Sequence, residues 1–270
     1  MMLGLSLAPG DIVVRRAAGG GASLLPQTEA WLAALTTAEL DHPTAPHIAA
    51  VDTFYGSLIS AGIYGSLDLL PCFFLESSDP ADSEGVALMD LIALQQWSAV
   101  NGPTFTAGVG FTGDGVSATV RPPFILGSTG NYALASAHAG VFNWTGVFGT
   151  TFAFGFGSTG VTALRADNAV NRINRQFNSG VPAPAGNRSS LLIDRDGDNV
   201  AVFADGSATP VSTALAAPLG LPNTLGGLFQ FTGNFWNTTE VGAFSAGAHL
   251  DVVGYVALHN AIQTLKAAVA

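Results

Sequence analysis

Apolar residues recur at the spacing of an amphipathic helix in three parts of the chain. The first covers residues 27–40 and ends before Pro43 and Pro46, the second covers residues 47–60, and the third covers residues 252–269. The sequence therefore predicts two successive helices that form a hairpin near the start of the chain and one helix at its end. The apolar positions that carry this spacing are Trp31, Leu32, Leu35 and Leu40; Ile48, Val51, Phe54, Tyr55, Leu58 and Ile59; and Tyr255, Leu258, Ile262, Leu265 and Val269.

From Leu69 onward the pattern changes to short apolar runs separated by turn residues. Residues 69–77 (LLPCFFLES) predict a buried strand, and residues 86–97 (VALMDLIALQQW) fit either a short helix or an irregular apolar crossing. Residues 103–120 (PTFTAGVGFTGDGVSATV) predict two short strands around a glycine-rich bend. Short strands with Gly-rich turns are typical of an antiparallel β-sandwich. Further strands are expected around Phe105 and at residues 116–120, 132–138, 147–156, 191–194, 200–204 and 228–232.

These patterns divide the chain into four segments of a mainly β protein. They are an extended N-terminal arm (residues 1–26), a helical hairpin (27–68), an antiparallel β-sandwich (69–250) and a C-terminal helix packed on the sandwich (251–270). The apolar face of the hairpin is expected to pack on the β domain rather than to form a separate binding groove.

The N-terminal arm has too few apolar residues to form a core of its own. It contains the pair Arg15 and Arg16 and the run Gly19, Gly20 and Gly21. A segment of this composition is extended or flexible unless a neighbour orders it. We expect it to contact a neighbouring subunit.

The composition excludes several classes of protein. Charged residues make up 10% of the 270 residues, the mean hydropathy is +0.39, and the net charge is −10 with nine basic residues. Nucleic-acid binding needs clustered Lys and Arg, so it is not expected. No uninterrupted apolar run is long enough to span a membrane, so membrane insertion is not expected either. Cys72 is the one cysteine and lies in an apolar run, which predicts a buried, inert thiol.

Asp194, Asp196 and Asp198 are the strongest candidates for metal chemistry. They alternate in IDRDGDNVAVFADG, and clustered carboxylates bind calcium. The segment lacks the bidentate Glu of an EF-hand loop, and it lies between two apolar runs, so a hairpin turn is the simpler interpretation. No other cofactor is expected.

No pattern of a nucleophilic or nucleotide-binding enzyme is present. The chain has no GxSxG and no phosphate-binding loop, and its five histidines are scattered. The aromatic residues allow a different function. Trp236 lies between Asn234 and Asn237 in what the pattern indicates is a loop, and sugars bind where an aromatic face meets amide groups. The Phe-rich stretch from Phe142 to Phe156 is expected to fill the core instead.

Four motifs in order resemble a family of minor virion structural proteins of tailed bacteriophages and gene-transfer particles. They are GGGAS in the arm, GIYGSLD after the second helix, the block AVNGPTFTAGVGFTGDG, and LLIDRDGDNVAVFADGS followed by GLPN and the last helix. Together they span nearly the whole chain. The resemblance implies a laminin-G-like or concanavalin-like jelly roll, and the family supplies no established catalytic residues. The chain departs from the family at RPPFILGSTGNYALAS, where relatives often have a TGFNP-like strand exit.

The expected function is therefore a non-enzymatic structural component of a tailed-phage-type virion, such as a minor tail, fibre, spike or capsid-associated protein. The expected partners are other virion proteins and copies of the same chain, with a trimer favoured. The virion is the expected location, after assembly in the cytoplasm of the bacterial host. The alternative is an adhesin that recognises polysaccharide on the host surface.

Overall fold

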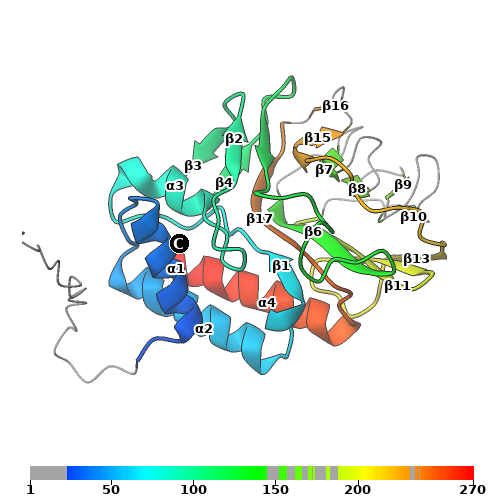
Figure 1. The fold of residues 1–270 in the computed structure, drawn as a ribbon, viewed down its shortest axis with the longest axis horizontal. Coiled ribbons are helices and arrows are strands. Elements are labelled where there is room, and N and C mark those ends of the chain that lie inside the picture. Colours follow the sequence, from blue (N-terminus) through cyan, green and yellow to red (C-terminus); the bar gives the residue numbers. More distant parts are fainter. Residues whose placement is uncertain are drawn as a thin grey trace, which may run out of the picture.

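A computed structural model gives the fold (Figure 1). It describes residues 23–144, 152–156, 162–165, 170–171, 173, 181–182, 188–231, 235–236 and 238–270. The described residues form antiparallel β-sheets with a few helices, as the sequence predicts for a mainly β protein. None of the helices in these ranges is both long and apolar enough to cross a membrane.

The three expected helices are present, and elementary capping chemistry explains where they begin. Pro26 and Pro46 lie in the first turns of their helices, where a missing backbone N–H costs no hydrogen bond. The Asp251 carboxylate caps the last helix by accepting a hydrogen bond from the backbone N–H of Gly254 at 2.7 Å. The helical elements are α1 (Pro26–Thr37), α2 (Ala45–Ser60), η1 (Tyr64–Ser66), η2 (Pro80–Asp82), α3 (Ser83–Leu88) and α4 (Val252–Val269).

The largest sheet in the described part of the chain has eight strands in the order β13-β12-β11-β6-β17-β4-β3, and β1 also pairs with β17. Smaller sheets are formed by β14-β7-β8, β10-β9, β15-β16 and β2-β5. The strands are β1 (Leu67–Leu69), β2 (Ser98–Val100), β3 (Thr104–Thr106), β4 (Gly110–Thr112), β5 (Thr119–Arg121), β6 (Ser136–Trp144), β7 (Phe152–Phe156), β8 (Thr162–Arg165), β9 (Val170–Asn171), β10 (Val181–Pro182), β11 (Ser190–Asp196), β12 (Asn199–Ala204), β13 (Ser212–Leu215), β14 (Gly227–Leu228), β15 (Gln230–Phe231), β16 (Phe235–Trp236) and β17 (Glu240–Gly247).

The large sheet is buried on both faces. Successive side chains of a strand point to opposite faces, and in β11 Leu191 and Ile193 join one hydrophobic cluster while Leu192 joins another. The first cluster also contains residues of β7, β8 and β14, and the second contains the apolar faces of α1, α2 and α4. Figure 1 shows α4 and α2 on one side of the sheet and the smaller strands on the other. The helical hairpin therefore packs on the β domain, as predicted.

Aromatic side chains fill the core on the side of the smaller sheets. Phe73 makes edge-to-face contacts with Trp97 and Phe111, at ring-centroid distances of 5.8 and 5.4 Å. Phe154 packs edge-to-face on Phe244 at 5.3 Å. In the predicted Phe-rich core stretch, Phe142, Phe154 and Phe156 are buried, which confirms the prediction for these three, and Phe148 lies outside the described residues.

Several strand predictions differ from the structure. Of the strand expected at residues 69–77, only Leu69 belongs to a strand, as the last residue of β1. The chain turns after Cys72, where the backbone N–H of Leu75 donates to the Cys72 carbonyl at 3.0 Å. The strand expected at residues 116–120 begins only at Thr119, because the Asp114 carboxylate accepts hydrogen bonds from the backbone N–H groups of residues 116–118 and holds them in a turn.

Two further strand predictions differ from the structure. The strand expected at residues 132–138 begins only at Ser136, because Tyr132 is held in a preceding loop by the Asp68 carboxylate, which accepts hydrogen bonds from the backbone N–H groups of Asn131 and Tyr132. The strand expected at residues 228–232 is interrupted at Phe229, whose φ of 64° lies in the left-handed region.

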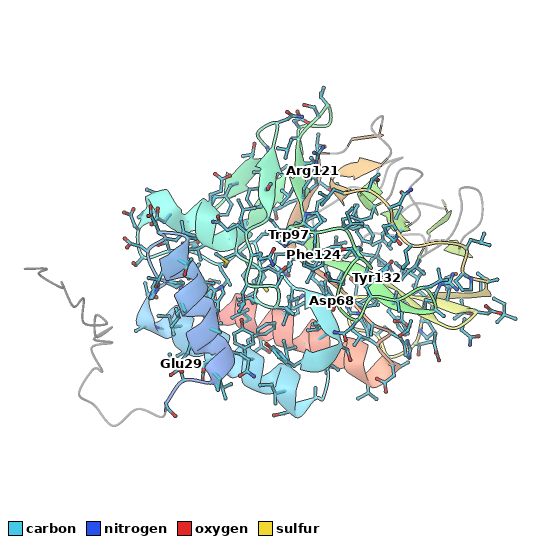
Figure 2. The ribbon with its side chains drawn as sticks, viewed as in Figure 1. Glu29, Asp68, Trp97, Arg121, Phe124 and Tyr132 are labelled. Carbon is cyan, nitrogen blue, oxygen red and sulfur yellow. The ribbon has the colours of Figure 1, made fainter. Side chains whose placement is uncertain are left out.

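Buried carboxylates fix the loops that leave the sheet. Asp68 is one, and Figure 2 shows it beside Tyr132 in the interior. Asp90 is fully buried and accepts hydrogen bonds from the backbone N–H of Leu70 and from the indole N–H of Trp97 at 2.9 Å. It also accepts hydrogen bonds from the backbone N–H groups of Ile92 and Ala93. A carboxylate offers only acceptors, so it satisfies donors that would otherwise be buried without partners.

The substitution Asp90→Asn is expected to destabilise the protein by about 2 to 3 kcal/mol, because the new amide points donors at N–H groups that need acceptors. Chemical denaturation measures this loss. Glu84→Gln, at an exposed acid on α3, is the matched control and should change the free energy of unfolding by less than about 0.5 kcal/mol. Equal stabilities of the two variants would contradict the assigned role of Asp90.

Candidate functional site

A groove of about 700 Å³ lies on the helix side of the large sheet, where β11, β12 and β13 extend beyond the N-terminus of α4. Residues opposite one another on adjacent antiparallel strands share a face, and two such rows form its floor. One row is Asp194, Ala201 and Thr213, and the other is Asp196, Asn199 and Leu215. The groove is further lined by Val200, Phe203, Pro210, Ala214, His249, Leu250, Asp251 and Val252.

Asp194 and His249 form an ion pair in this groove. The imidazole Nδ1 lies 2.6 Å from Asp194 Oδ2, and the backbone N–H of Leu250 donates to the other carboxylate oxygen at 2.9 Å. The bond to Asp194 raises the pKa of His249, and the charges of Asp196 and Asp251 raise it further. Burial raises the pKa of Asp194. A proton on the Asp194–His249 pair is therefore held more tightly than a proton on either group alone would be.

The hairpin interpretation of the Asp194–Asp198 segment is confirmed. Asp196, the last residue of β11, pairs with Asn199, the first residue of β12. Gly197 and Asp198 between them therefore form a two-residue turn. Gly197 has a φ of +60°, which a first turn residue of type II′ needs. No three His, Cys, Asp or Glu side chains among the residues that the structure describes form a group able to hold a metal ion. Calcium binding by Asp194, Asp196 and Asp198 stays a prediction.

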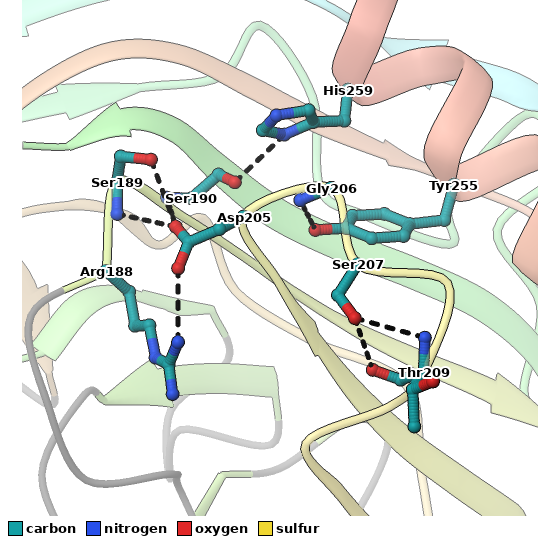
Figure 3. A network of polar contacts seen from close by, with 9 residues as sticks. All are labelled: Arg188, Ser189, Ser190, Asp205, Gly206, Ser207, Thr209, Tyr255 and His259. Atoms are coloured by element: carbon teal, nitrogen blue, oxygen red, sulfur yellow. Dashed lines mark hydrogen bonds and ion pairs between the residues drawn. The ribbon is translucent and has the colours of Figure 1, made fainter.

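A second polar network joins the other end of β11 to α4 (Figure 3). Asp205 Oδ1 accepts hydrogen bonds from the backbone N–H groups of Ser189 and Ser190, and its other oxygen pairs with Arg188 at 3.3 Å. Ser190 Oγ lies 3.0 Å from Nδ1 of the buried His259. The network connects the β11–β12 hairpin to the helix, which is a structural role.

Gly206 belongs to the same junction, and its backbone N–H donates to the Tyr255 hydroxyl at 2.9 Å. A Cβ at this position would lie 2.4 Å from the His259 ring, and the φ of +73° also favours glycine. Tyr255 itself stacks on Phe203 at 4.9 Å. The end of β12 and the face of α4 are therefore in direct contact here.

Ser245 and His138 are in contact as a nucleophile and its general base would be, but a substrate has no access to them. Ser245 Oγ lies 2.8 Å from His138 Nε2, and His138 Nδ1 bonds to the carbonyl of Ala248. Both side chains are fully buried between the sheet and the helices, so no substrate can reach them. Burial lowers the pKa of His138 to about 4, which keeps the ring neutral at pH 7.

Arg195 is a fully buried cation on the opposite face of β11 from Asp194. Its guanidinium donates to the carbonyls of Ile173, Gly197 and Ala216, with distances of 3.1 Å from Nε and 3.0 Å from Nη2 to the Ile173 oxygen. These bonds hold the β11–β12 turn and the end of β13 against the second layer. Arg195 thus fixes the floor of the groove without facing it.

The other predicted site residues lie partly or wholly outside the described residues. Arg15, Arg16 and the glycines of the arm lie in residues 1–22, and Asn234 and Asn237 are also outside. The backbone of Trp236 belongs to β16 and pairs with Gln230, so the prediction that it lies in a loop is wrong. Glycan binding at Trp236 stays a prediction.

Sequence reasoning missed two titratable members of the groove, His249 and Asp251. Asp194 and His249 are 55 positions apart, and no local motif links them. The available signal was weak: Asp251 precedes a predicted helix and is a natural cap, which places its neighbours at a helix end beside the sheet.

No known protein-family model matches the chain, and no curated protein is similar to it in sequence. Solved structures similar in shape include sialidases of Trypanosoma rangeli. A mutant displaying trans-sialidase activity has a TM-score of 0.42 and 9% identity, with 81% of this chain and 39% of that chain covered. A complex with 2,3-difluorosialic acid has a TM-score of 0.42 and 14% identity over 78% and 39%. The chain spans about two fifths of the length of these enzymes, and at such TM-scores the likeness carries no argument about function.

Lowering the pH from 6.5 towards 4 should destabilise the protein through His138. The unfolded histidine takes up a proton below its ordinary pKa of 6.5, whereas the folded one does so only near 4. The contribution of His138 to the free energy of unfolding is therefore complete above pH 6.5. It decreases as the pH falls, by up to about 1.4 kcal/mol per pH unit. Urea denaturation at pH 7, 6 and 5 measures the slope. His138→Gln should show a shallower slope, and identical slopes would contradict the assignment.

Proposed function

We propose that the chain is a non-enzymatic structural component of a tailed-phage-type virion, anchored to neighbouring proteins by its N-terminal region. The observation that carries the proposal is the exposed apolar surface around the groove, where Leu215 is 81% exposed and Val253 is 73% exposed. The chain has few charges to keep such a surface in water. Exposed apolar patches of this kind are typical of surfaces that other proteins cover.

The virion assignment itself rests on the resemblance of the four sequence motifs. The block GPTFTAGVGFTGDG contributes the hairpin of β3 and β4 at one edge of the large sheet, and LLIDRDGDNVAVFADGS contributes β11 and β12 near the other. Family-like motifs thus supply both sides of the sheet. We propose for the body a sandwich of the laminin-G-like or concanavalin-like jelly-roll type, which the antiparallel strand order supports.

The absence of enzymatic activity is part of the proposal. Among the described residues, the groups best suited to catalysis have structural partners: Asp90 holds a loop, and Ser245 and His138 are buried. The Asp194–His249 pair is reachable, but Asp194 is committed to His249 and to the backbone of Leu250. We propose a homo-oligomer, with a trimer favoured, because symmetric copies can cover the apolar patch.

Immunogold electron microscopy of purified particles tests the virion assignment. Antibody against the recombinant chain should label one defined place on the head or the tail. Pre-absorbing the antibody with the recombinant chain is the control and should remove the label. Unlabelled particles, with the protein free in the lysate, would contradict the proposal.

Deletion of residues 1–22 should prevent incorporation into particles without unfolding the body. The buried residues of α1 lie beyond this segment, and the backbone N–H of Leu25, directly before α1, donates to Asp52 Oδ1 at 2.7 Å. Immunoblots of purified particles measure incorporation, and thermal unfolding measures stability. Deletion of residues 1–10 keeps Arg15, Arg16 and the glycines and is the matched control. Normal incorporation of the longer deletion would argue against anchoring by the arm.

A further inference from the structure

We infer that the groove beside α4 receives residues 11–16 (DIVVRR) of the N-terminal arm of a neighbouring copy of this chain. The inference deepens the proposed function by naming what the arm docks on, and it rests on that function only in the expectation that copies assemble. Its test uses purified protein and is independent of particles.

The groove and the arm segment carry complementary charges. Three carboxylates, those of Asp194, Asp196 and Asp251, line the groove around one imidazole. Asp194 is engaged with His249, whereas Asp196 and Asp251 are exposed at the surface. The chain has only nine basic residues, and Arg15 and Arg16 are an adjacent pair of them. An arginine pair is therefore a fitting counterpart for an acidic rim whose one basic side chain is a histidine.

The apolar part of the groove fits the apolar part of the segment. Leu215 on β13 and Val252 at the start of α4 line the groove and are 81% and 36% exposed, and Val253, next to Val252, is 73% exposed. Ile12, Val13 and Val14 immediately precede the arginine pair, so the segment brings aliphatic and basic side chains together. Covering these residues removes apolar surface from water, which is favourable at about 25 cal/mol per Å².

The backbone of β13 offers a place for an extended segment. β13 pairs with β12 on one side, and no strand in the described ranges pairs with its other side. An edge strand with open N–H and C=O groups readily accepts an added strand. Residues 12–14 are β-branched, which suits an extended conformation.

The reach of the arm favours a neighbouring copy over the same chain. Figure 1 shows that α1 begins on the side of the molecule where α4 ends. The groove is lined by Asp251 and Val252, at the opposite end of α4. The 18 residues of α4 span about 27 Å. The seven residue-to-residue steps from Arg16 to Ser23 reach at most about 25 Å when fully extended, and a path around the surface is longer than a straight line.

Disulfide trapping between two differently tagged full-length chains tests the inference. One chain carries Arg16→Cys and the other carries Leu215→Cys, and the two are mixed under mild oxidation. The native Cys72 is buried and does not compete. The expected result is several-fold more mixed dimer than with Val116→Cys, a matched control that is 70% exposed outside the groove. Equal yields for the two pairs would overturn the inference.

Two further variants sharpen the test. Adding Asp196→Lys to the Leu215→Cys chain should lower the yield of mixed dimer several-fold, and Glu84→Lys should leave it unchanged. Both are compared with the parent by thermal unfolding, so that loss of fold is recognised. A chain carrying both Arg16→Cys and Leu215→Cys tests for docking within one molecule: an intramolecular disulfide at high dilution, without mixed dimers, would overturn the assignment to a neighbouring copy.

Discussion

Burial of both faces of β6, β11 and β17 is the constraint on which the rest of the structure depends. One face of these strands packs on the smaller sheets and the other on the helices, so a strand such as β11 contributes alternate residues to two clusters. If either covering layer were missing, this sheet would expose an apolar face to water. The helical hairpin and α4 are therefore parts of the same body as the sheets, although they lie at opposite ends of the sequence.

The polar groups of the interior serve the same constraint. Loops that leave a doubly buried sheet bring backbone donors out of water, and Asp68 and Asp90 supply acceptors for them. His138 and Ser245 satisfy each other on the helix-covered face, and Arg195 satisfies carbonyls on the opposite face. Groups that could carry out chemistry on a surface are used to hold the layers together.

The groove arises where the covering layer ends before the sheet does. At the Ser190 end of β11, α4 contacts the sheet through His259, and at the Asp196 end the strand extends beyond the helix. Asp251 both caps the helix and adds a carboxylate to the rim of the groove. The uncovered corner therefore combines apolar and acidic character, which is the combination that the proposed docking of the arm uses.

Local patterns in the sequence determined the helices, the β3–β4 hairpin and the two-residue turn at Gly197 and Asp198, because helix periodicity and turn chemistry act between residues close in the chain. They also indicated the buried state of Cys72. Only the tertiary structure decided the order of the strands, the interruption at Phe229 and the pairing of Asp194 with His249. These depend on which distant segments share a face, and hydrophobic burial is non-directional, so composition alone does not select the partners.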